Sequence, residues 1–221
     1  MYYYPVMLDL KRKKCLVAGG GKVALRKVIG LLRAQASIIV ISPEFSKHFH
    51  RFSNKVNMIR REIEESDITK DLALVIAATN IHNVNEMISG RANALNVPCN
   101  VVDQPDLCSF IVPAIVRRGD VTVAVSTNAA SPRLSKYIKN KVSNVIGSEY
   151  SGIASCMAKV RLILREHCNN QAMRFALWEQ IFETDPVVFI QKHGLAEYQK
   201  YIDNILSEYI DTDQHIGLEN T

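Results

Sequence analysis

The 221-residue sequence predicts an α/β fold that begins with a parallel sheet and ends in helices. Three observations lead to this expectation. Short apolar, β-branched runs alternate with helical patterns as far as Asp103, which is typical of parallel strands joined by helices. Two β runs then flank Arg117-Arg118-Gly119-Asp120, a pattern that predicts an antiparallel hairpin. From Ser151 onward, apolar side chains recur at helical spacing.

These changes of pattern divide the chain into three predicted parts. Residues 1–113 hold the parallel sheet, residues 114–150 hold the hairpin and one helix, and residues 151–221 hold helices alone. The middle part cannot extend a parallel sheet by a strand–helix–strand step. We therefore expect it to be a separate small module, and an interface between subunits is one use for it.

The composition excludes several classes of protein. No apolar run is long enough to span a bilayer, and no basic segment followed by an apolar one opens the chain, so we expect a cytoplasmic protein without a membrane partner. The net charge of +5 is mild and no aromatic residues interleave a basic platform, so we expect no nucleic-acid partner. The 5 cysteines and 6 histidines show no ligand spacing, which predicts reduced thiols and no metal site.

The first predicted strand, Cys15–Ala18, runs into three glycines and then into a helix over about residues 23–34. As a G-x-G-x-x-A pattern it uses Gly19 for a tight turn, Gly21 for close approach of the backbone to a pyrophosphate, and Ala24 for close packing of helix on strand. The helix start would hold the anion. The pattern predicts a dinucleotide-binding domain of the Rossmann type; the alternative is a glycine turn that serves packing only.

Further apolar runs predict the rest of this sheet. The expected strands cover about residues 37–41, 57–61, 72–78 and 97–102, and a helix covers about residues 81–95. Ser42-Pro43 should cap and open a short helix after the second strand. Ligands of such sheets bind beyond the carboxyl ends of the strands. The residues at those ends should therefore line one crevice: Gly19–Lys22, Ser42–Glu44, Thr79-Asn80 and Asp103.

The remaining elements follow from turn and cap signals. The hairpin should use the β runs at residues 110–116 and 121–125, and Ser131-Pro132 should open a helix that reaches about Ile146. Asp185-Pro186 should start a later helix. The aromatic stripe that includes Tyr198 and Tyr201 has helical spacing, and we interpret it as core rather than as a cofactor site.

Asp103 is the first candidate for chemistry. A carboxylate just beyond an apolar strand, at the mouth of a nucleotide crevice, is placed to take a proton while a hydride leaves for a nicotinamide. The alternative is an aspartate that only satisfies its own turn.

Glu44 is the candidate for cofactor choice. Dinucleotide folds often carry an acid at the end of the second strand that accepts from the ribose hydroxyls. The expected position holds Ile41 and Ser42, and the acid comes slightly later. Because no arginine for a ribose phosphate follows this strand, NAD is favoured over NADP. The alternative is a glutamate that merely suits the first turn of a helix.

The middle module carries the candidates for substrate binding. Ser126 opens a loop of small residues that leads into a helix, where a substrate carboxylate could bind, although a plain connector is an equal alternative. Arg117 and Arg118 belong to a group of basic residues that favours a polyanionic substrate, the alternative being a solvated face. The group also contains Arg133, Lys136 and Lys139.

Taken together, these motifs resemble those of the precorrin-2 dehydrogenases, the dehydrogenase part of siroheme synthase. The resemblance covers roughly the first 150 residues, and the helical remainder is similar in kind. Its most specific part is Asn100-Val-Val-Asp103 followed by Ser109-Phe-Ile-x-Pro113. The other matching segments are Pro5–Leu10, Cys15–Lys27, Ala77–Thr79, Val123–Ser126 and Ser131-Pro132.

The resemblance implies NAD-dependent oxidation of precorrin-2 to sirohydrochlorin, a step of siroheme and porphyrin-type biosynthesis, by a homodimer. It places Lys22 and Val23 against NAD, Pro43 and Glu44 near the adenosine ribose, and Thr79 on the nicotinamide side. Asp103 matches the essential aspartate of the family. Ser126 or Thr127 matches a position that is phosphorylated in some relatives, and that modification is not carried over.

Three alternatives to a dehydrogenase alone stay open at this stage. Some members of the family also insert ferrous iron into sirohydrochlorin, so the chain is either a dehydrogenase or a bifunctional enzyme. In the second alternative, from a different class, it is a non-catalytic NAD-sensing module, which would not need Asp103. The third is a chelatase alone, which would tolerate damage to the glycine loop.

Overall fold

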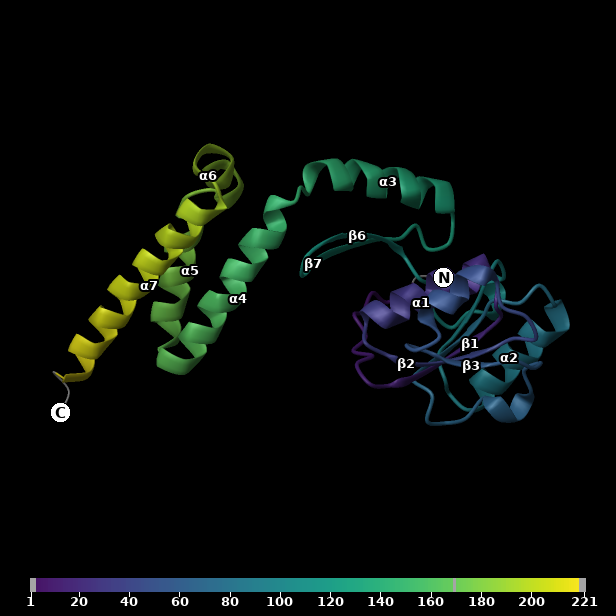
Figure 1. The fold of residues 1–221 in the computed structure, drawn as a ribbon. Coiled ribbons are helices and arrows are strands. Elements are labelled where there is room, and N and C mark those ends of the chain that lie inside the picture. The colour runs from purple at the N-terminus through teal and green to yellow at the C-terminus, as the bar shows by residue number, and fades with distance from the viewer. Residues whose placement is uncertain (1–2, 169, 219–221) are drawn as a thin grey trace. The chain divides into compact units, whose positions relative to one another are not determined.

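The computed structural model describes residues 3–168 and 170–218, with side chains as far as residue 209 (Figure 1). Contacts within the chain separate it into two compact units. Unit 1 is Met1–Val112 with Asn128–Ala130, and unit 2 is Pro113–Thr127 with Ser131–Thr221. The three-part division expected from the sequence stays a prediction.

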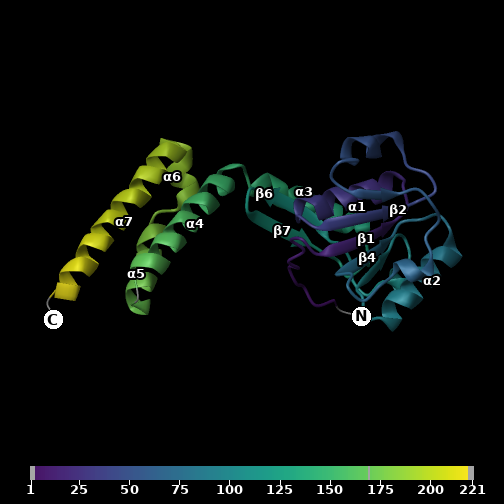
Figure 2. The same cartoon turned by 60° about the horizontal axis from the view of Figure 1, so that its bottom comes forward.

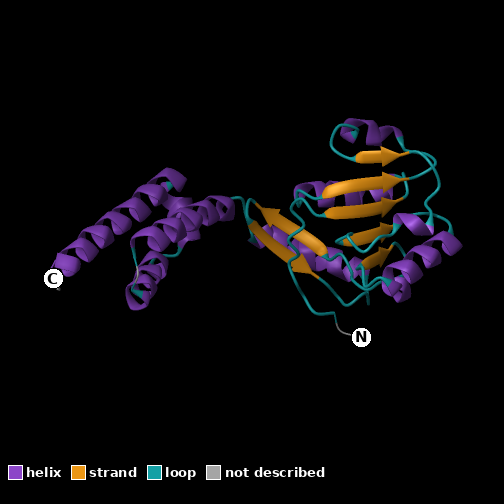
Figure 3. Cartoon of the chain, turned by 90° about the horizontal axis from the view of Figure 1, so that it is seen from below, coloured by secondary structure: helices purple, strands orange, loops and turns teal. Residues whose placement is uncertain are grey.

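Unit 1 is built on a parallel sheet whose strands lie side by side in the order β3-β2-β1-β4-β5 (Figure 3). The middle strand pairs with a neighbour on each side, so that Val17 lies opposite both Val40 and Ile76. This confirms the predicted parallel sheet. The strands are β1 (Lys14–Ala18), β2 (Ser37–Ile41), β3 (Asn57–Ile59), β4 (Leu74–Ala77) and β5 (Cys99–Val101).

Two helices cover opposite faces of this sheet, α1 (Lys22–Arg33) and α2 (His82–Ala94) (Figure 2). Leu16 and Ala18 pack in the core cluster that includes Ile88 of α2. Cys15 and Val17 pack in the other, with Val28 of α1. Because successive side chains of a strand point to opposite faces, a strand buried on both faces must be apolar at every position. That is why these strands read as continuous apolar runs.

The structure corrects one predicted helix. Ser42 and Pro43 do not open a helix, and the next helical segment is a short 3₁₀ helix at Lys47–Phe52. The Ser42 hydroxyl donates to the carbonyl of Glu44 at 2.7 Å instead of capping. Residues 42–46 therefore form a turn that passes close to the glycine loop. Two other short 3₁₀ helices lie at Glu65–Asp67 and Pro105–Leu107.

Unit 2 begins with the predicted hairpin. Strands β6 (Ala114–Arg118) and β7 (Val121–Val125) pair antiparallel around Gly119, whose φ is 55°. The first strand starts later than expected, because the Phe110 carbonyl accepts from the side chain of Asn100 at 3.0 Å and this segment stays with unit 1. Helix α3 (Pro132–Val145) follows, and the Ser131 hydroxyl caps it by accepting from Leu134 N at 3.2 Å.

The rest of unit 2 is helical, as expected. Residues from α4, α5 and α7 form one apolar core around Tyr198, which is fully buried, so the predicted role of this aromatic residue as core is confirmed. Gly194, with φ 86°, separates the last two helices. The helices are α4 (Glu149–His167), α5 (Gln171–Glu183), α6 (Pro186–His193) and α7 (Leu195–Leu218) (Figure 1).

Loss of the α6 cap should measurably weaken unit 2. The Asp185 carboxylate accepts from Val187 N at 2.8 Å and from Val188 N at 3.1 Å. We expect Asp185→Ala to lower the free energy of unfolding by about 1 kcal/mol, as for other caps. Denaturant unfolding followed by circular dichroism would measure it. Glu183→Ala, at the exposed end of α5, is the control and should change stability little; equal effects of the two variants would contradict the capping role.

Candidate active site

The predicted crevice lies at the carboxyl edge of the parallel sheet. Backbone hydrogen bonds join the segments just beyond four strands there: Gly19 N donates to Ile41 O at 2.9 Å, Ala78 N to Ala18 O at 2.8 Å and Val102 N to Ala77 O at 2.9 Å. Since β1 leads to β2 on one side and lies beside β4 on the other, the edge between β1 and β4 is the topological switch point, where such sheets bind ligands.

Two of the three glycines are required by close contacts. Gly19 has φ 115°, and a Cβ there would lie 2.3 Å from the Ala78 carbonyl oxygen. A Cβ on Gly20 would lie 1.9 Å from the Glu44 carbonyl oxygen, and the Gly20 carbonyl accepts from Ser46 N at 2.9 Å. The glycine loop is therefore held between the end of β4 and the turn after β2. Gly20 was not among the predicted site residues, although the run of three glycines was a signal for it.

Gly21 differs from the other two. A Cβ on Gly21 would meet no atom within 4 Å, and the residue is exposed. Gly21 precedes α1 without a side-chain cap, and Leu25 N makes the first helical bond to Gly21 O at 3.0 Å. The first turn of α1, with the amides of Lys22, Val23 and Ala24, therefore starts beside the open space at Gly21.

This geometry fits the pyrophosphate of a dinucleotide. The helix dipole makes its N-terminus positive, and the space beside Gly21 lets a phosphate approach the backbone. Ala24 is fully buried, as the third position of the pattern requires. Lys22 is exposed at the first helical position, and Val23 is half-buried at the second.

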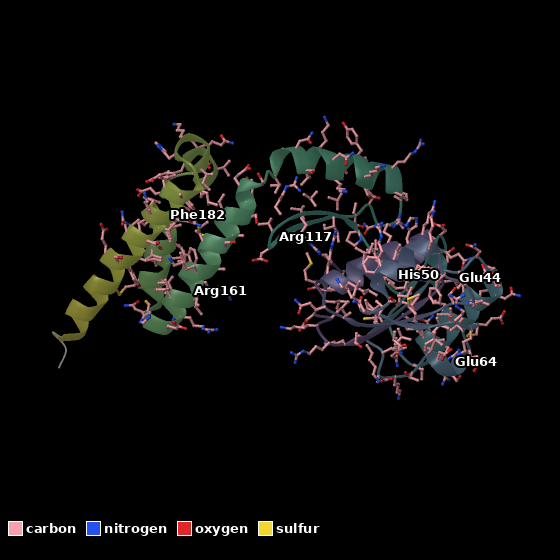
Figure 4. All side chains as sticks on the ribbon, viewed as in Figure 1. Glu44, His50, Glu64, Arg117, Arg161 and Phe182 are labelled. Atoms are coloured by element: carbon pink, nitrogen blue, oxygen red, sulfur yellow. The ribbon has the colours of Figure 1, made fainter. Side chains whose placement is uncertain are left out.

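Pro43 and Glu44 lie in the turn after β2, and both are exposed; Glu44 is labelled in Figure 4. The Glu44 carbonyl contacts the glycine loop and accepts from the Ser42 hydroxyl, so its backbone position is set from two sides. Its side chain lies at the surface of unit 1. Ser42 itself is 7% exposed and stands where a ribose-binding acid would usually be.

Thr79 organises the loop between β4 and α2. Its hydroxyl donates to the Asn85 side-chain oxygen at 2.8 Å, and the Asn85 amide donates to the Thr79 carbonyl at 3.2 Å. Ile81 N donates to the same hydroxyl at 3.2 Å. The Thr79 hydroxyl is therefore engaged within the protein, and its contribution to a nicotinamide site would be to position the loop. Asn85, 3% exposed, was missed because nothing in the sequence pairs it with Thr79.

Asp103 lies at the tip of the turn after β5, with φ 60°, and it is exposed. The turn is closed by Cys108, whose thiol sulfur accepts from Val101 N at 3.1 Å. On the other side, Gln104 Nε2 lies 2.6 Å from Nδ1 of His82. In the described part of the chain, the Asp103 carboxylate accepts no hydrogen bond. This argues against an aspartate that only satisfies its own turn, because the thiol already closes it.

The substrate candidates lie in unit 2. Arg118 Nη2 donates to the Ser143 carbonyl and hydroxyl, both at 3.0 Å, and so ties the hairpin to α3. Arg117 is exposed on the hairpin, with Nε 3.3 Å from the Thr122 hydroxyl (Figure 4). Ser126 is exposed just after β7. Their roles in substrate binding stay predictions.

The described part of the chain contains neither a metal-binding cluster nor a membrane-spanning helix. No three His, Cys, Asp or Glu residues within residues 3–168 and 170–209 are grouped so that they could hold a metal ion. The helices within the described residues 3–168 and 170–218 are too short or too polar to cross a membrane.

Several known proteins are similar to this chain in sequence or in fold. Residues 6–114 match the family described as "Putative NAD(P)-binding". Siroheme synthase of Nitrosomonas europaea is 40% identical over 185 residues, which are 83% of this chain and 39% of that protein. The enzyme of Nitrosomonas eutropha is 36% identical over 96% of this chain and 45% of its own length. The chain thus spans about two fifths of the curated relatives' length.

A solved structure extends the similarity to the whole fold. SirC, a precorrin-2 dehydrogenase, superposes with a TM-score of 0.74 at 25% identity, covering 91% of this chain and 100% of its own. The chain is thus similar to these siroheme synthases over most of its own length and to SirC over nearly all of its fold. The resemblance inferred from the motifs is confirmed, and so is a nicotinamide dinucleotide as cofactor, since residues 6–114 are an NAD(P)-binding domain.

Substitutions at Gly19 and Gly21 should have different effects, one on folding and the other on cofactor binding. Gly19→Ala places a methyl group against the Ala78 carbonyl at a φ that L-residues rarely adopt, so we expect it to lower stability by about 1–3 kcal/mol or more. Gly21→Ala has open space and should unfold like the wild type, yet weaken NAD binding at least tenfold. Thermal unfolding and NAD titration measure the two effects. A Gly21→Ala protein with wild-type NAD affinity would contradict the assigned phosphate site.

Proposed function

We propose that this protein oxidises precorrin-2 to sirohydrochlorin with NAD, as a step of siroheme biosynthesis. The observation that carries the proposal is the position of Asp103. Its carboxylate is exposed and has no hydrogen bond within the described chain. It lies beyond β5, at the same edge of the sheet as the first-turn amides of α1. The names of the related siroheme synthases and of SirC support the same reaction.

The proposed reaction removes two hydrogen atoms from the substrate, which amount to two electrons and two protons. Precorrin-2 loses one hydride and one proton, so the products are sirohydrochlorin, NADH and a proton. NAD, when bound, supplies the hydride acceptor. The first-turn amides of α1 bind the pyrophosphate, Thr79 positions the loop beside β4, and Asp103 accepts or relays the proton.

Glu44 supports NAD over NADP. Its carboxylate lies in the turn after β2, where the adenosine ribose binds in folds of this order. A carboxylate can accept from ribose hydroxyls, and it repels a ribose phosphate. The choice is therefore attributed to Glu44, because Ser42 at the usual position uses its hydroxyl within the turn.

Precorrin-2 carries eight carboxylates, so its binding site needs basic groups. Arg117 and Arg118 on β6 are assigned to this role together with Ser126. Arg117 is the more available of the two arginines, because Arg118 also holds Ser143 of α3.

The proposal includes a homodimer in the cytoplasm. Large apolar side chains are exposed on α3, which supports a subunit interface there: Leu134 at 48%, Tyr137 at 59% and Val145 at 72%. All five cysteines are free thiols, as in proteins of a reducing compartment.

The first test is the reaction itself, followed anaerobically. Purified protein, precorrin-2 and NAD should form NADH in step with sirohydrochlorin. Asp103→Ala should lower kcat by about 10²–10⁴-fold, the usual contribution of a general base, while NAD binds as in the wild type. Wild-type protein that binds NAD without forming NADH would support a sensing module instead. Ferrous ion added to the completed reaction tests the bifunctional alternative, since iron insertion changes the tetrapyrrole spectrum.

Cofactor choice gives a second test. Glu44→Ala should reduce the preference for NAD over NADP, measured as the ratio of kcat/KM values, by about tenfold, because losing one charged hydrogen bond and one repulsion costs at least about 1.4 kcal/mol. Glu62→Ala, an exposed carboxylate elsewhere in unit 1, is the matched control. An unchanged ratio in Glu44→Ala would remove Glu44 from the ribose site.

A further inference from the structure

Helix α2 has two buried polar side chains on the face that packs against the sheet. Asn85 is 3% exposed and Ser89 is 1% exposed, whereas Ile88 and Ala92 beside them are apolar and fully buried. A helix face that covers a sheet is normally apolar, and a buried polar group is unfavourable unless it is hydrogen-bonded. The hydrogen-bond partners of Asn85 and Ser89 therefore show what these two residues do.

Ser89 binds the segment that carries Asp103. Its hydroxyl donates to the Leu107 carbonyl at 2.8 Å. Leu107 ends the short 3₁₀ helix Pro105–Leu107, which begins two residues after Asp103. Because the bond joins residues 18 positions apart, it connects α2 to the turn beyond β5 and adds nothing to the helix itself.

Asn85 binds the loop beyond β4. Its side-chain oxygen accepts from the Thr79 hydroxyl at 2.8 Å, and its side-chain nitrogen donates to the Thr79 carbonyl at 3.2 Å. Residues four positions apart lie on one side of a helix, about 6 Å apart along its axis. Through Asn85 and Ser89, one rigid helix thus holds both segments that carry candidate residues of the reaction, Thr79 and Asp103.

Other hydrogen bonds hold the two ends of the turn that carries Asp103. At its start, the Cys108 sulfur accepts from Val101 N at 3.1 Å and closes the turn on its own strand. At its return, the Asn100 side chain donates to the Phe110 carbonyl at 3.0 Å and accepts from Lys27 Nζ at 2.9 Å. These bonds fasten the ends of the turn to β5 and α1.

The middle of the turn lies beyond the end of β5 and is bound to α2. Besides the bond from Ser89, Gln104 Nε2 lies 2.6 Å from Nδ1 of His82. His82, Asn85 and Ser89 follow the spacing i, i+3, i+7 and so share one side of the helix. An alanine at position 89 would pack on the sheet without burying a polar group. What serine adds there is the bond to the turn.

We propose that Ser89 and Asn85 are positioning residues for the dehydrogenation: from α2 they keep the turn that carries Asp103 and the loop that carries Thr79 at one separation, so that the carboxylate takes its proton beside the nicotinamide. The roles of Asp103 and the nicotinamide rest on the proposed function above, whereas the bonds of Ser89 and Asn85 do not. A misplacement of about 1 Å can lower a rate by about 10²-fold. Loss of these bonds should therefore reduce turnover in a protein that still folds.

The experiment uses the full chain with four substitutions, made one at a time. Ser89→Ala and Asn85→Leu remove the hydrogen bonds and leave side chains that are readily buried. Ile88→Val deletes one methyl group from the same face of α2 and leaves the hydrogen bonds in place, so it controls for lost stability. Asn93→Ala changes an exposed asparagine of α2 and controls for substitution on this helix.

Three kinds of measurement are made on each variant. Amide hydrogen exchange followed by NMR needs no turnover and reports local opening of the two segments. Steady-state kinetics give kcat and the KM for precorrin-2, and NAD affinity is titrated separately. Thermal unfolding gives the melting temperature.

Amide exchange should show which segment each side chain holds. We expect Ser89→Ala to speed exchange of the Leu107 amide, which is hydrogen-bonded within the turn, by about two- to tenfold, the effect of one lost hydrogen bond. Asn85→Leu should do the same for the Ile81 amide, which is hydrogen-bonded within the loop beyond β4. Exchange in Asn93→Ala should equal that of the wild type.

Turnover should fall more than stability explains. Ser89→Ala and Asn85→Leu should lower kcat by about ten- to 10²-fold, while KM and NAD affinity change less than threefold. Ile88→Val should lower the melting temperature about as much as Ser89→Ala and leave kcat within twofold of the wild type. If Asn85→Leu does not fold, Ser89→Ala, which is the smaller change, decides.

Two results have different meanings. Folded Ser89→Ala protein whose kcat falls no further than that of Ile88→Val overturns the proposal, and so does amide exchange that matches the wild type. Wild-type protein that forms no NADH refutes the proposed function instead, and amide exchange then decides whether α2 holds the two segments.

Discussion

The close packing of backbone on backbone at Gly19 and Gly20 is the constraint on which the site depends. Neither residue has room for a Cβ, because the Ala78 and Glu44 carbonyls occupy that space. The ends of β1, β2 and β4 are therefore drawn together at one edge, and α1 must start from that edge. Gly21, one residue later, is open. Gly19 and Gly20, which have no room for a side chain, set the position of α1. Gly21 has open space beside it, so the N-terminus of α1 is accessible to an anion.

The fold could be predicted because its local and global requirements agree. A strand buried between two helix layers has to be apolar throughout. The apolar run from Cys15 to Ala18 therefore predicts a buried strand from the sequence alone. The failure at Ser42-Pro43 has a specific cause. Serine caps a helix only if its hydroxyl is available, and here that hydroxyl donates to the Glu44 carbonyl, which the glycine loop also contacts. Local propensity was overridden by a tertiary contact.

The sequence indicated candidate site residues only where their type and their spacing from a predicted strand formed a recognisable pattern. Gly21, Thr79 and Asp103 follow strands at the expected places, whereas Asn85, Cys108 and Lys27 have no pattern that marks them. The bond between Lys27 and Asn100 joins residues 73 positions apart. Neither end looks unusual alone, since lysines are common on helices and asparagines are common near strand ends. The burial of the amide and its bond to Lys27 are visible only in the structure.

The turn beyond β5 shows how backbone and side-chain requirements can be separated. At φ 60° an asparagine or glycine would suit the backbone of residue 103 at least as well as aspartate. The turn itself is closed by the Cys108 sulfur and held on α2 through Gln104 and His82. What aspartate adds at this position is therefore its carboxylate, and that group is exposed rather than used within the turn. The proposed proton transfer needs such a carboxylate, because the group has to meet the substrate without first giving up bonds to the protein.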